Sequence, residues 1–470
     1  MKKNCVIAFS SLMLSCALYA QNKRMNVVFI MADDLGLNDT GYTGSDFYET
    51  PNIDKLSEEG MVFTNAYSSA ANSAPSRACF MSGMYTPRHG IFTVSPPDRG
   101  DRTKRKLIPI PNVEDLRKDI PTMGELFKRN GYRCGHVGKW HLGDDEDGTG
   151  PLSRGFDVNV AGGRAGTPYS YYYPYCNNKG MCHIGLEKGK QGEYLTDRLT
   201  DEAVAFIKES AHGEKPFFLY LAHHAVHTPI TAPQSIVDKY EKKAKGKYHT
   251  NSVYAAMVET LDNSVGKICG IIDSLGISDN TIIIFNSDNG GSEPITDNYT
   301  VRGGKGMPYE GGNRVPLIVK WPNVAKAGKI SDCPVNNIDF FSTFQMYLEG
   351  KIGDELDGTD IYPLLNNEKS SIERDLFWHF PAYLESYTDN GKGFRAKPYT
   401  SVRSGKWKLI YYYENENTEL FDLDKDPLEE HDLSCVNEEM VSILKKKIFS
   451  WIERVNAPVP TKLNPYYEGD

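Results

Sequence analysis

The feature that most constrains the fold is a series of short, continuously apolar segments that end in polar residues. Asn26–Ala32, Pro216–Ala222 and Thr281–Phe285 are of this kind. Unbroken runs of apolar and β-branched residues are typical of strands buried on both faces of a parallel sheet. Residues 195–207 and 253–272 lie between these runs and repeat apolar side chains with helical spacing. We therefore predict an α/β fold with a large, mostly parallel sheet sandwiched by helices.

Local signals place one more helix and two more strands. Thr122 and Glu125 have capping-box spacing, and Asn130-Gly131 marks the end of that helix before a predicted strand over 132–137. Residues 316–320 form a further predicted strand. Residues 162–175 contain glycines, prolines and five tyrosines without a regular period, so we expect a long loop there.

The pattern changes after Leu365. Short aromatic and β-branched runs at 400–403, 407–413 and 419–422 predict an antiparallel meander, and an apolar stripe over 440–455 predicts a final helix. We predict a large α/β domain over residues 21–365 and a smaller C-terminal α+β domain, an antiparallel sheet plus a helix, over residues 366–470.

Residues 1–20 have the composition of a secretory signal peptide, with Lys2-Lys3 followed by an apolar stretch and Ala20. This predicts a periplasmic or secreted protein; lipoprotein anchoring through Cys16 is the alternative. No later stretch reaches the roughly 18 apolar residues of a transmembrane segment. Seven cysteines follow the signal peptide, and Cys176 and Cys182 are close enough in sequence to form a disulfide.

The net charge of -9 and the absence of a long Lys or Arg run argue against a nucleic-acid or anionic-membrane surface. Any anionic ligand must therefore meet a local basic pocket. Candidate cations follow predicted strands, begin a short helical pattern or occupy Gly-rich stretches: Arg77, Lys139, His141, His227, Lys305 and Arg314. His223 and His224 precede His227, but no cysteine or HExxH partner favours a transition metal, so we interpret one histidine as a proton donor.

Carboxylates follow two of the predicted strands. Asp33 and Asp34 come directly after one, and Asp288 and Asn289 come shortly after another. Open α/β sheets bind ligands at the carboxyl ends of their strands. Three carboxylates and an amide oxygen suit a hard cation, so we predict a calcium site, with magnesium as the alternative.

Ser73 begins the segment Ser73-Ala74-Pro75-Ser76-Arg77, which leads into a short helical pattern. At a helix N-terminus, unpaired N–H groups favour anions, which suits a nucleophile. The structural alternative for Ser73 is an ordinary N-capping serine.

The order of these motifs resembles that of the sulfatase family within the alkaline phosphatase superfamily, over nearly all of residues 25–460. The shared motifs are the acidic pair, the Ser-x-Pro-x-Arg helix continuing to Ser82-Gly83, Gly-Lys-Trp-His, His-x-Pro, Asp-Asn-Gly-Gly and Gly-Lys-Gly. The resemblance implies an alkaline phosphatase-like fold and a sulfuric ester hydrolase.

The resemblance also implies roles for individual residues. In this family the residue at the position of Ser73 is oxidised to formylglycine. Many members have cysteine there, whereas this chain has serine, so the resemblance implies a serine-type radical sulfatase-maturing enzyme. The predicted metal ligands are Asp33, Asp34, modified Ser73, Asp288 and Asn289. In the implied mechanism Lys139 and Lys305 hold the sulfate, and His227 protonates the departing alcohol. His141 helps to release the bound sulfate, and Arg77 orients the hydrated aldehyde.

The sequence indicates less about the substrate than about the reaction. Export and the Tyr-rich loop favour a sulfated carbohydrate, such as a glycosaminoglycan, mucin-type or algal glycan. We expect action at chain ends, with the smaller domain closing one side of the pocket and Arg314, His379 and Arg395 as substrate contacts. One alternative is a phosphoester or phosphonate hydrolase of the same superfamily with unmodified Ser73. Another is a non-catalytic glycan-binding protein.

Overall fold

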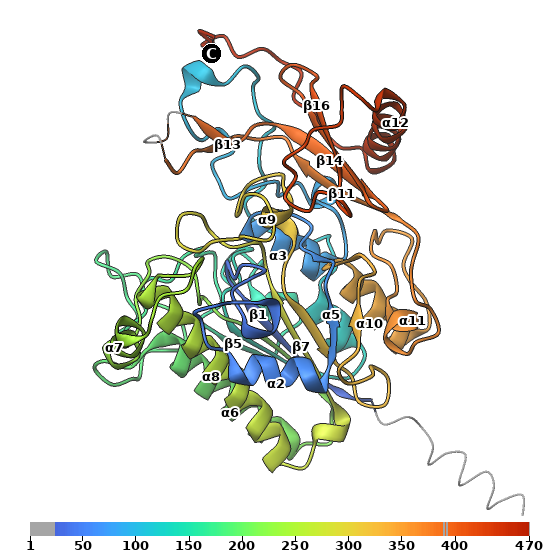
Figure 1. Ribbon diagram of the computed structural model, residues 1–470. Helices are drawn as coiled ribbons and strands as arrows, with labels where there is room; N and C mark the ends of the chain where they lie inside the picture. Colours follow the sequence, from blue (N-terminus) through green and yellow to red (C-terminus); the bar gives the residue numbers. More distant parts are fainter. Residues whose placement is uncertain (1–23, 389–390, 392, 470) are drawn as a thin grey trace, which may run out of the picture.

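The computed structural model describes residues 24–388, 391 and 393–469 (Figure 1). The predicted signal peptide over 1–20, with Cys16, lies outside the described residues. A large sheet and its helices form the body of the molecule, and a smaller sheet with the last helix lies above it in the view of Figure 1. Within the described chain, no helix is both long and apolar enough to cross a membrane.

The large sheet has eight strands and is mixed but mostly parallel, as predicted. At its centre β1 runs parallel to both β6 and β7, with Val28 opposite Leu219 and Ile283. The predicted strand over 316–320 runs antiparallel to β7, a direction that its apolar pattern does not encode. In spatial order the strands are β5 (Val158–Val160), β4 (Arg133–Gly138), β6 (Phe217–Ala222), β1 (Asn26–Ala32), β7 (Thr281–Ser287), β8 (Leu317–Lys320), β2 (Met61–Phe63) and β9 (Ile330–Ser331).

Helices cover both faces of this sheet because its central strands are apolar on both sides. Val28 and Ile30 pack into one core, whereas Val27 and Phe29 pack into the other. The first core is covered by α2 (Pro51–Glu59), α6 (Leu195–Ala211), α7 (Gln234–Lys242) and α8 (Ser252–Ser274). The second is covered by α3 (Ser73–Ser82), α5 (Met123–Arg129), α10 (Asp339–Glu349) and α11 (Tyr362–Leu365). The capping box of Thr122 and Glu125 forms at the start of α5, as predicted.

The C-terminal part contains the predicted antiparallel sheet with one additional strand, β11. The sheet order is β11 (Asp375–Phe380), β14 (Tyr399–Ser404), β15 (Trp407–Tyr412) and β16 (Thr418–Asp422). The last helix, α12 (Glu438–Val455), packs Leu444, Ile448 and Trp451 against this sheet. The domain boundary at residue 365 stays a prediction.

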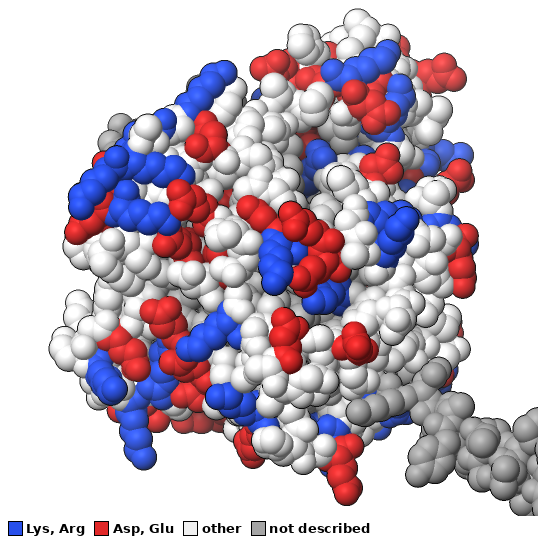
Figure 2. All heavy atoms as spheres, turned by 60° about the horizontal axis from the view of Figure 1, so that its bottom comes forward, with Lys and Arg blue, Asp and Glu red and all other residues white. Residues whose placement is uncertain are grey.

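Shorter elements complete the chain: α4 (Thr86–His89), α9 (Glu310–Asn313), the pair β3 (Ala66–Tyr67) and β10 (Val335–Asn336), and the hairpin β12 (Leu384–Glu385) and β13 (Phe394–Ala396). Residues 162–175 form a loop without a helix or strand, as expected, and a disulfide joins Cys176 to Cys182. On the face in Figure 2, acidic and basic side chains are interspersed.

Candidate active site

The carboxyl ends of β1 and β7 bring the predicted acidic residues together. Asp33, Asp34, Asp288 and Asn289 are all at most 3% exposed. The Asp288 amide donates to the Ala32 carbonyl at 3.1 Å, and the Asp34 amide donates to Asp288 Oδ1 at 3.1 Å. Parallel pairing of the two strands therefore fixes the relative positions of the acidic residues.

Ser73 is the first residue of α3, and its side chain points toward this acidic group. Its hydroxyl lies 3.1 Å from Asp33 Oδ1 and 3.3 Å from Asn289 Oδ1. Asn72 occupies the N-cap position, so Ser73 is not the N-cap residue of α3. The hydroxyl is thus placed at a helix N-terminus without serving as its cap.

Arg77 lies one turn further along α3 and forms an ion pair with Asp288 of the acidic cluster. Its Nε and Nη2 each lie 2.8 Å from Asp288 Oδ2, and its Nη1 donates to the Lys139 carbonyl at 3.2 Å. Burial opposes the charge, but Asp288, Tyr220 and Asp33 together outweigh burial and raise the pKa of the Arg77 guanidinium. Burial raises the pKa of the Asp288 carboxyl, although Arg77 opposes this.

Two lysines reach the acidic pair from opposite sides. Lys139, at the end of β4, lies 2.7 Å from Asp33 Oδ2, and Lys305 lies 2.7 Å from Asp34 Oδ2. Burial lowers the pKa of Lys139. Burial also opposes the charge of Lys305, but Asp34 and Asp33 together outweigh it and raise the pKa of Lys305. Burial alone would raise the pKa of Asp34, but Lys305 and His227 hold it well below its usual value.

His227 and His141 lie at the edge of this cluster. His227 Nε2 lies 3.7 Å from Asp34 Oδ2, while its Nδ1 donates to the Thr228 carbonyl at 2.7 Å. Burial and then Lys305 lower the pKa of His227 to about 3, so the imidazole is neutral at pH 7. The pKa of His141 is also lowered, by burial and by Lys139. A β-carbon on Gly166 would lie only 2.4 Å from His141 Nε2, so the ring fits tightly against the loop.

The donor set fits a hard divalent cation. A carboxylate oxygen from each of Asp33 and Asp34 and a ring nitrogen of His227 lie within 4.8 Å of one another. Asp33 Oδ1 and Asn289 Oδ1 also both face the Ser73 hydroxyl. Clustered oxygen atoms of this kind are the ligands that calcium prefers and magnesium accepts. Asp426, Glu430 and His431 form a second, more exposed cluster away from these residues.

The three predicted substrate contacts occupy different environments. Arg314 donates to the Thr64 carbonyl at 2.8 Å and lines a separate groove with Tyr42. His379 is 3% exposed within the smaller sheet, and both of its ring nitrogens have partners. Arg395 lies against Gly306, the residue after Lys305, so it adjoins the acidic cluster.

A groove beside Lys305 was not predicted from sequence as a unit. It has a volume of about 630 Å³ and includes Glu293, Asp297 and Arg395. A β-carbon on Gly304 would lie 3.2 Å from Glu293 Cγ, which places the groove next to Lys305. The Arg395 guanidinium lies 3.7 Å from the Tyr387 ring centroid. Glu293 and Asp297 carry no motif, because they lie in a loop that only the fold brings next to Arg395 on β13.

His224, one of the three histidines considered as a proton donor, is also buried. Its side chain is 1% exposed, and neither ring nitrogen has a hydrogen-bond partner among the described residues. Burial and the nearby His183 lower the pKa of His224 well below its usual value. The Tyr171 hydroxyl, from the Tyr-rich loop, donates to the His224 and His227 carbonyls, each at 2.7 Å. One tyrosine of that loop therefore supports the histidine segment rather than facing a ligand.

Comparison with protein families gives two matches. The Sulfatase model matches residues 25–349, and the model for the C-terminal part of N-sulphoglucosamine sulphohydrolase matches residues 304–456.

Similar proteins cover almost the whole chain. A sulfatase of Formosa agariphila is 31% identical over 93% of this chain and 90% of its own length. The mouse N-acetylgalactosamine-6-sulfatase is 31% identical over 90% of this chain and 84% of its own length. A crystal structure of Ps i-CgsB in complex with k-i-k-neocarrahexaose superposes with a TM-score of 0.76 at 30% identity, covering 94% and 95% of the two chains.

Proposed function

Because the chain belongs to the sulfatase family, we propose that this sulfuric ester hydrolase removes sulfate from a carbohydrate through a formylglycine made from Ser73. The observation that carries the proposal is the position of the Ser73 hydroxyl, 3.1 Å from Asp33, at the N-terminus of α3. Lys139 and Lys305 form ion pairs with the neighbouring carboxylates of Asp33 and Asp34, and both lysines can bind a sulfate. Two similar proteins support a sugar substrate. One is named N-acetylgalactosamine-6-sulfatase, and the other was crystallised with k-i-k-neocarrahexaose.

The side chains divide the work of the reaction. Lys139 and Lys305 hold the sulfate oxygens and offset the charge that develops on them. Arg77, fixed by Asp288, orients the nucleophilic side chain from one turn away. His227 is neutral when the site is free, and the bound sulfate favours its protonated form, which donates a proton to the leaving oxygen. His141, also neutral, accepts the proton when sulfate is released.

Asp33, Asp34, Asp288 and Asn289 would hold the cation, with calcium preferred over magnesium for an all-oxygen set. A cation held there would lower the pKa of the attacking hydroxyl and neutralise sulfate charge, and a formylglycine hydrate at residue 73 would offer a second hydroxyl for release of the sulfate. Oxidation of Ser73 removes two hydrogens, and a serine-type radical maturing enzyme would carry it out. Residues 1–20 would direct the protein to the periplasm or outside the cell.

The groove beside Lys305 suits the sugar that leaves. Glu293 and Asp297 can accept hydrogen bonds from sugar hydroxyls, and Arg395 can bind a further acidic group. The hairpin of β12 and β13 contributes Ser386, Tyr387 and Phe394 to one wall of this groove. A wall on that side supports removal of sulfate from chain ends. Arg395 is therefore the predicted substrate contact that we retain.

The test compares 4-nitrophenyl sulfate with 4-nitrophenyl phosphate, using protein produced with a serine-type maturing enzyme. We expect turnover of the sulfate to exceed that of the phosphate by orders of magnitude. Faster turnover of the phosphate would support the alternative phosphoester hydrolase instead. Sulfated monosaccharides, disaccharides and intact polymers then define the substrate, and release of sulfate only from the interior of polymers would contradict action at chain ends.

A further inference from the structure

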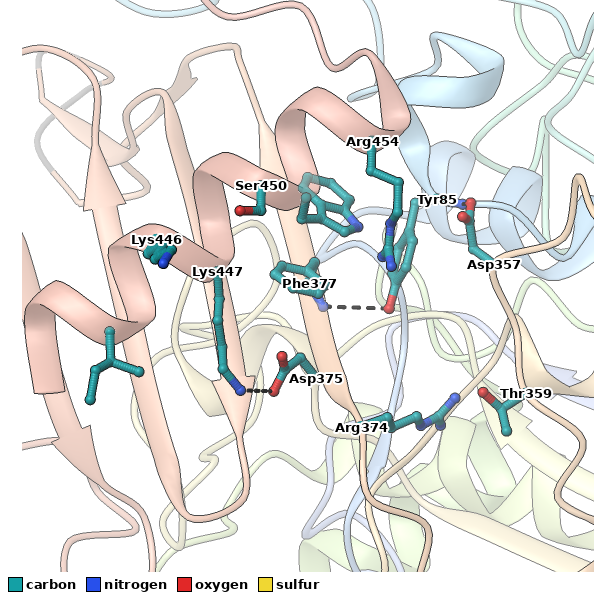
Figure 3. A pocket seen from close by; sticks show the side chains of 12 residues that line it. Tyr85, Asp357, Thr359, Arg374, Asp375, Phe377, Lys446, Lys447, Ser450 and Arg454 are labelled. Carbon is teal, nitrogen blue, oxygen red and sulfur yellow. Dashed lines mark hydrogen bonds and ion pairs between the residues drawn. The ribbon is translucent and has the colours of Figure 1, made fainter.

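A second cavity lies between the last helix and the smaller sheet, and it has no part in the proposed reaction (Figure 3). Its volume is about 800 Å³, which is within the range of small-molecule sites. Asp357 lines it, and the Asp357 amide donates to the carbonyl of Gly83, the C-cap of α3. Ser73 begins that ten-residue helix, so the cavity and the active site lie at opposite ends of α3, about 15 Å apart.

The cavity carries an excess of positive charge. Four cations line it: Arg374, Lys446, Lys447 and Arg454. Two of these are compensated, since Arg374 pairs with Asp339 and Lys447 lies 2.9 Å from Asp375. Lys446 and Arg454 form no ion pair with any carboxylate in the described part of the chain. The carboxylate of Asp357 is already bound by Arg88 at 2.7 Å, so it does not offset them.

The floor of the cavity is aromatic and retains unused donors. Phe377 stacks on Trp451 with ring centroids 4.9 Å apart, and Tyr85 meets Trp451 edge-on at 5.4 Å. Trp451 is 2% exposed, and its Nε1 is buried without a hydrogen-bond acceptor among the described residues. Arg374 Nε, on another wall, is likewise buried without one. The Tyr85 hydroxyl accepts from the Phe377 amide at 3.4 Å, which leaves its hydrogen for another acceptor.

We propose that this cavity is a second binding site for a sulfated sugar unit, which holds a glycan chain away from the active site. The choice of ligand rests on the proposed function. Lys446 and Arg454 are eight residues, about 12 Å, apart on α12, so they bind the anionic groups of neighbouring units of the chain. The ring of the unit beside Arg454 lies against the aromatic floor, and the exposed Ile443 lies at the other end of the cavity. An apolar floor with a cationic rim matches a ring that has C–H faces and an anionic substituent. The protein as a whole is acidic, so a local basic cavity is needed to retain such a chain.

The test measures binding apart from catalysis. Full-length mature protein made without a maturing enzyme keeps an unmodified Ser73 and does not consume its ligand. Its migration in gels that contain ι-carrageenan or chondroitin 6-sulfate gives a binding constant for each polymer. We expect Lys446→Ala/Arg454→Ala to bind one or both polymers roughly fivefold more weakly, as for two exposed charge contacts.

Two further variants separate the cavity from general charge. Ser450→Trp keeps both cations but places a large ring at an exposed position on the cavity wall, and we expect it to weaken binding similarly. Lys208→Ala/Lys242→Ala removes the same charge from exposed sites on α6 and α7 and should leave binding unchanged. In matured protein, all three variants should hydrolyse 4-nitrophenyl sulfate at the wild-type rate, because none of these residues lies in the active site.

The outcomes are distinct. Unchanged polymer binding in both Lys446→Ala/Arg454→Ala and Ser450→Trp would overturn the proposal, even if the matured enzyme desulfates saccharides. Equal binding of poly-glutamate and of the sulfated polymers would overturn the sugar assignment. If matured protein releases no sulfate from any saccharide but the cavity variants still lose polymer binding, the proposed function fails and the binding site stands.

Discussion

The Lys139 ammonium lies 2.7 Å from Asp33 Oδ2, and both side chains are completely buried. The two charges compensate each other in a place from which water is excluded. Removal of one partner of a buried pair typically costs about 3–5 kcal/mol. Arg77 Nη2 lies 3.8 Å from Asp33 Oδ1, so it still offsets part of the Asp33 charge when Lys139 is absent. The pair therefore contributes to folding as well as to sulfate binding.

Lys139→Ala should lower the free energy of unfolding by about 3–5 kcal/mol and abolish sulfatase activity. Lys139→Ala/Asp33→Asn should recover much of the stability but none of the activity, because both ions are then absent. Urea unfolding followed by tryptophan fluorescence measures the first effect. Equal stability of the single and double variants would show that Asp33 does not depend on Lys139.

Formylglycine should be present at Ser73 in protein produced with a serine-type maturing enzyme. Mass spectrometry of the peptide that contains Ser73 should show the loss of two hydrogens, and fragmentation should assign it to that residue. Ser76→Ala, which changes a neighbouring serine in the same helix, should still be converted, whereas Ser73→Ala should not. Full activity with unmodified serine would rule out the formylglycine mechanism.

The main layers of the fold follow from local sequence, whereas strand direction does not. The apolar runs that form β1, β6 and β7 are buried on both faces, and their short, unbroken apolar composition identifies them. The antiparallel direction of β8 depends on how the Gly-rich segment before it returns to the sheet, which no residue pattern shows. β2 has only three residues, too few for any period to be detected.

The site divides in the same way. Asp33, Ser73 and Lys305 belong to motifs with fixed spacing, so sequence places them at one sheet edge. His379 was expected at the substrate, but its ring nitrogens bind Thr400 and the Pro458 carbonyl inside the smaller sheet. Glu293 carries no motif and adjoins Lys305 only because the loop after β7 folds back, so tertiary structure alone identifies it.

Calcium should bind at the acidic cluster and raise the melting temperature of the protein. Ligands that bind only the folded state stabilise it in proportion to the logarithm of their concentration. Chelation should abolish activity, and calcium should restore it. Asp288→Ala should lose both the activity and the calcium-dependent increase in melting temperature. Asp426→Ala, in the more exposed acidic cluster, is the control and should keep both.

His227→Ala should affect substrates according to their leaving group. General-acid catalysis typically contributes 10²–10⁴-fold, and only poor leaving groups need the proton. We expect a loss of roughly that size in kcat/KM with a sulfated sugar and a much smaller loss with 4-nitrophenyl sulfate. His431→Ala changes an exposed histidine and should leave both rates unchanged. Equal losses on both substrates would show that His227 is not the acid.

A buried pair of carboxylates beneath the smaller sheet should make stability depend on pH. Lys408 lies 3.0 Å from Glu310 and 2.9 Å from Glu429, and Arg403 Nη1 lies 3.9 Å from Glu310. Glu429 therefore shares Lys408 with Glu310. Burial raises the pKa of Glu429 from 4.5 to about 7, although Lys408 opposes this.

Since the folded state binds the Glu429 proton more tightly, this residue should stabilise the protein least above pH 7. Its contribution to the free energy of unfolding should increase by roughly 3 kcal/mol as pH falls from 7 toward 4.5. Glu429→Gln mimics the protonated acid, so the variant should be more stable than wild type at pH 8 and should approach it at pH 5. Glu430→Gln changes an exposed neighbour and should follow the wild type at every pH. Urea unfolding at pH 5, 6, 7 and 8 measures the difference in the free energy of unfolding between Glu429→Gln and wild type. If this difference is the same at every pH, Glu429 does not titrate in this range.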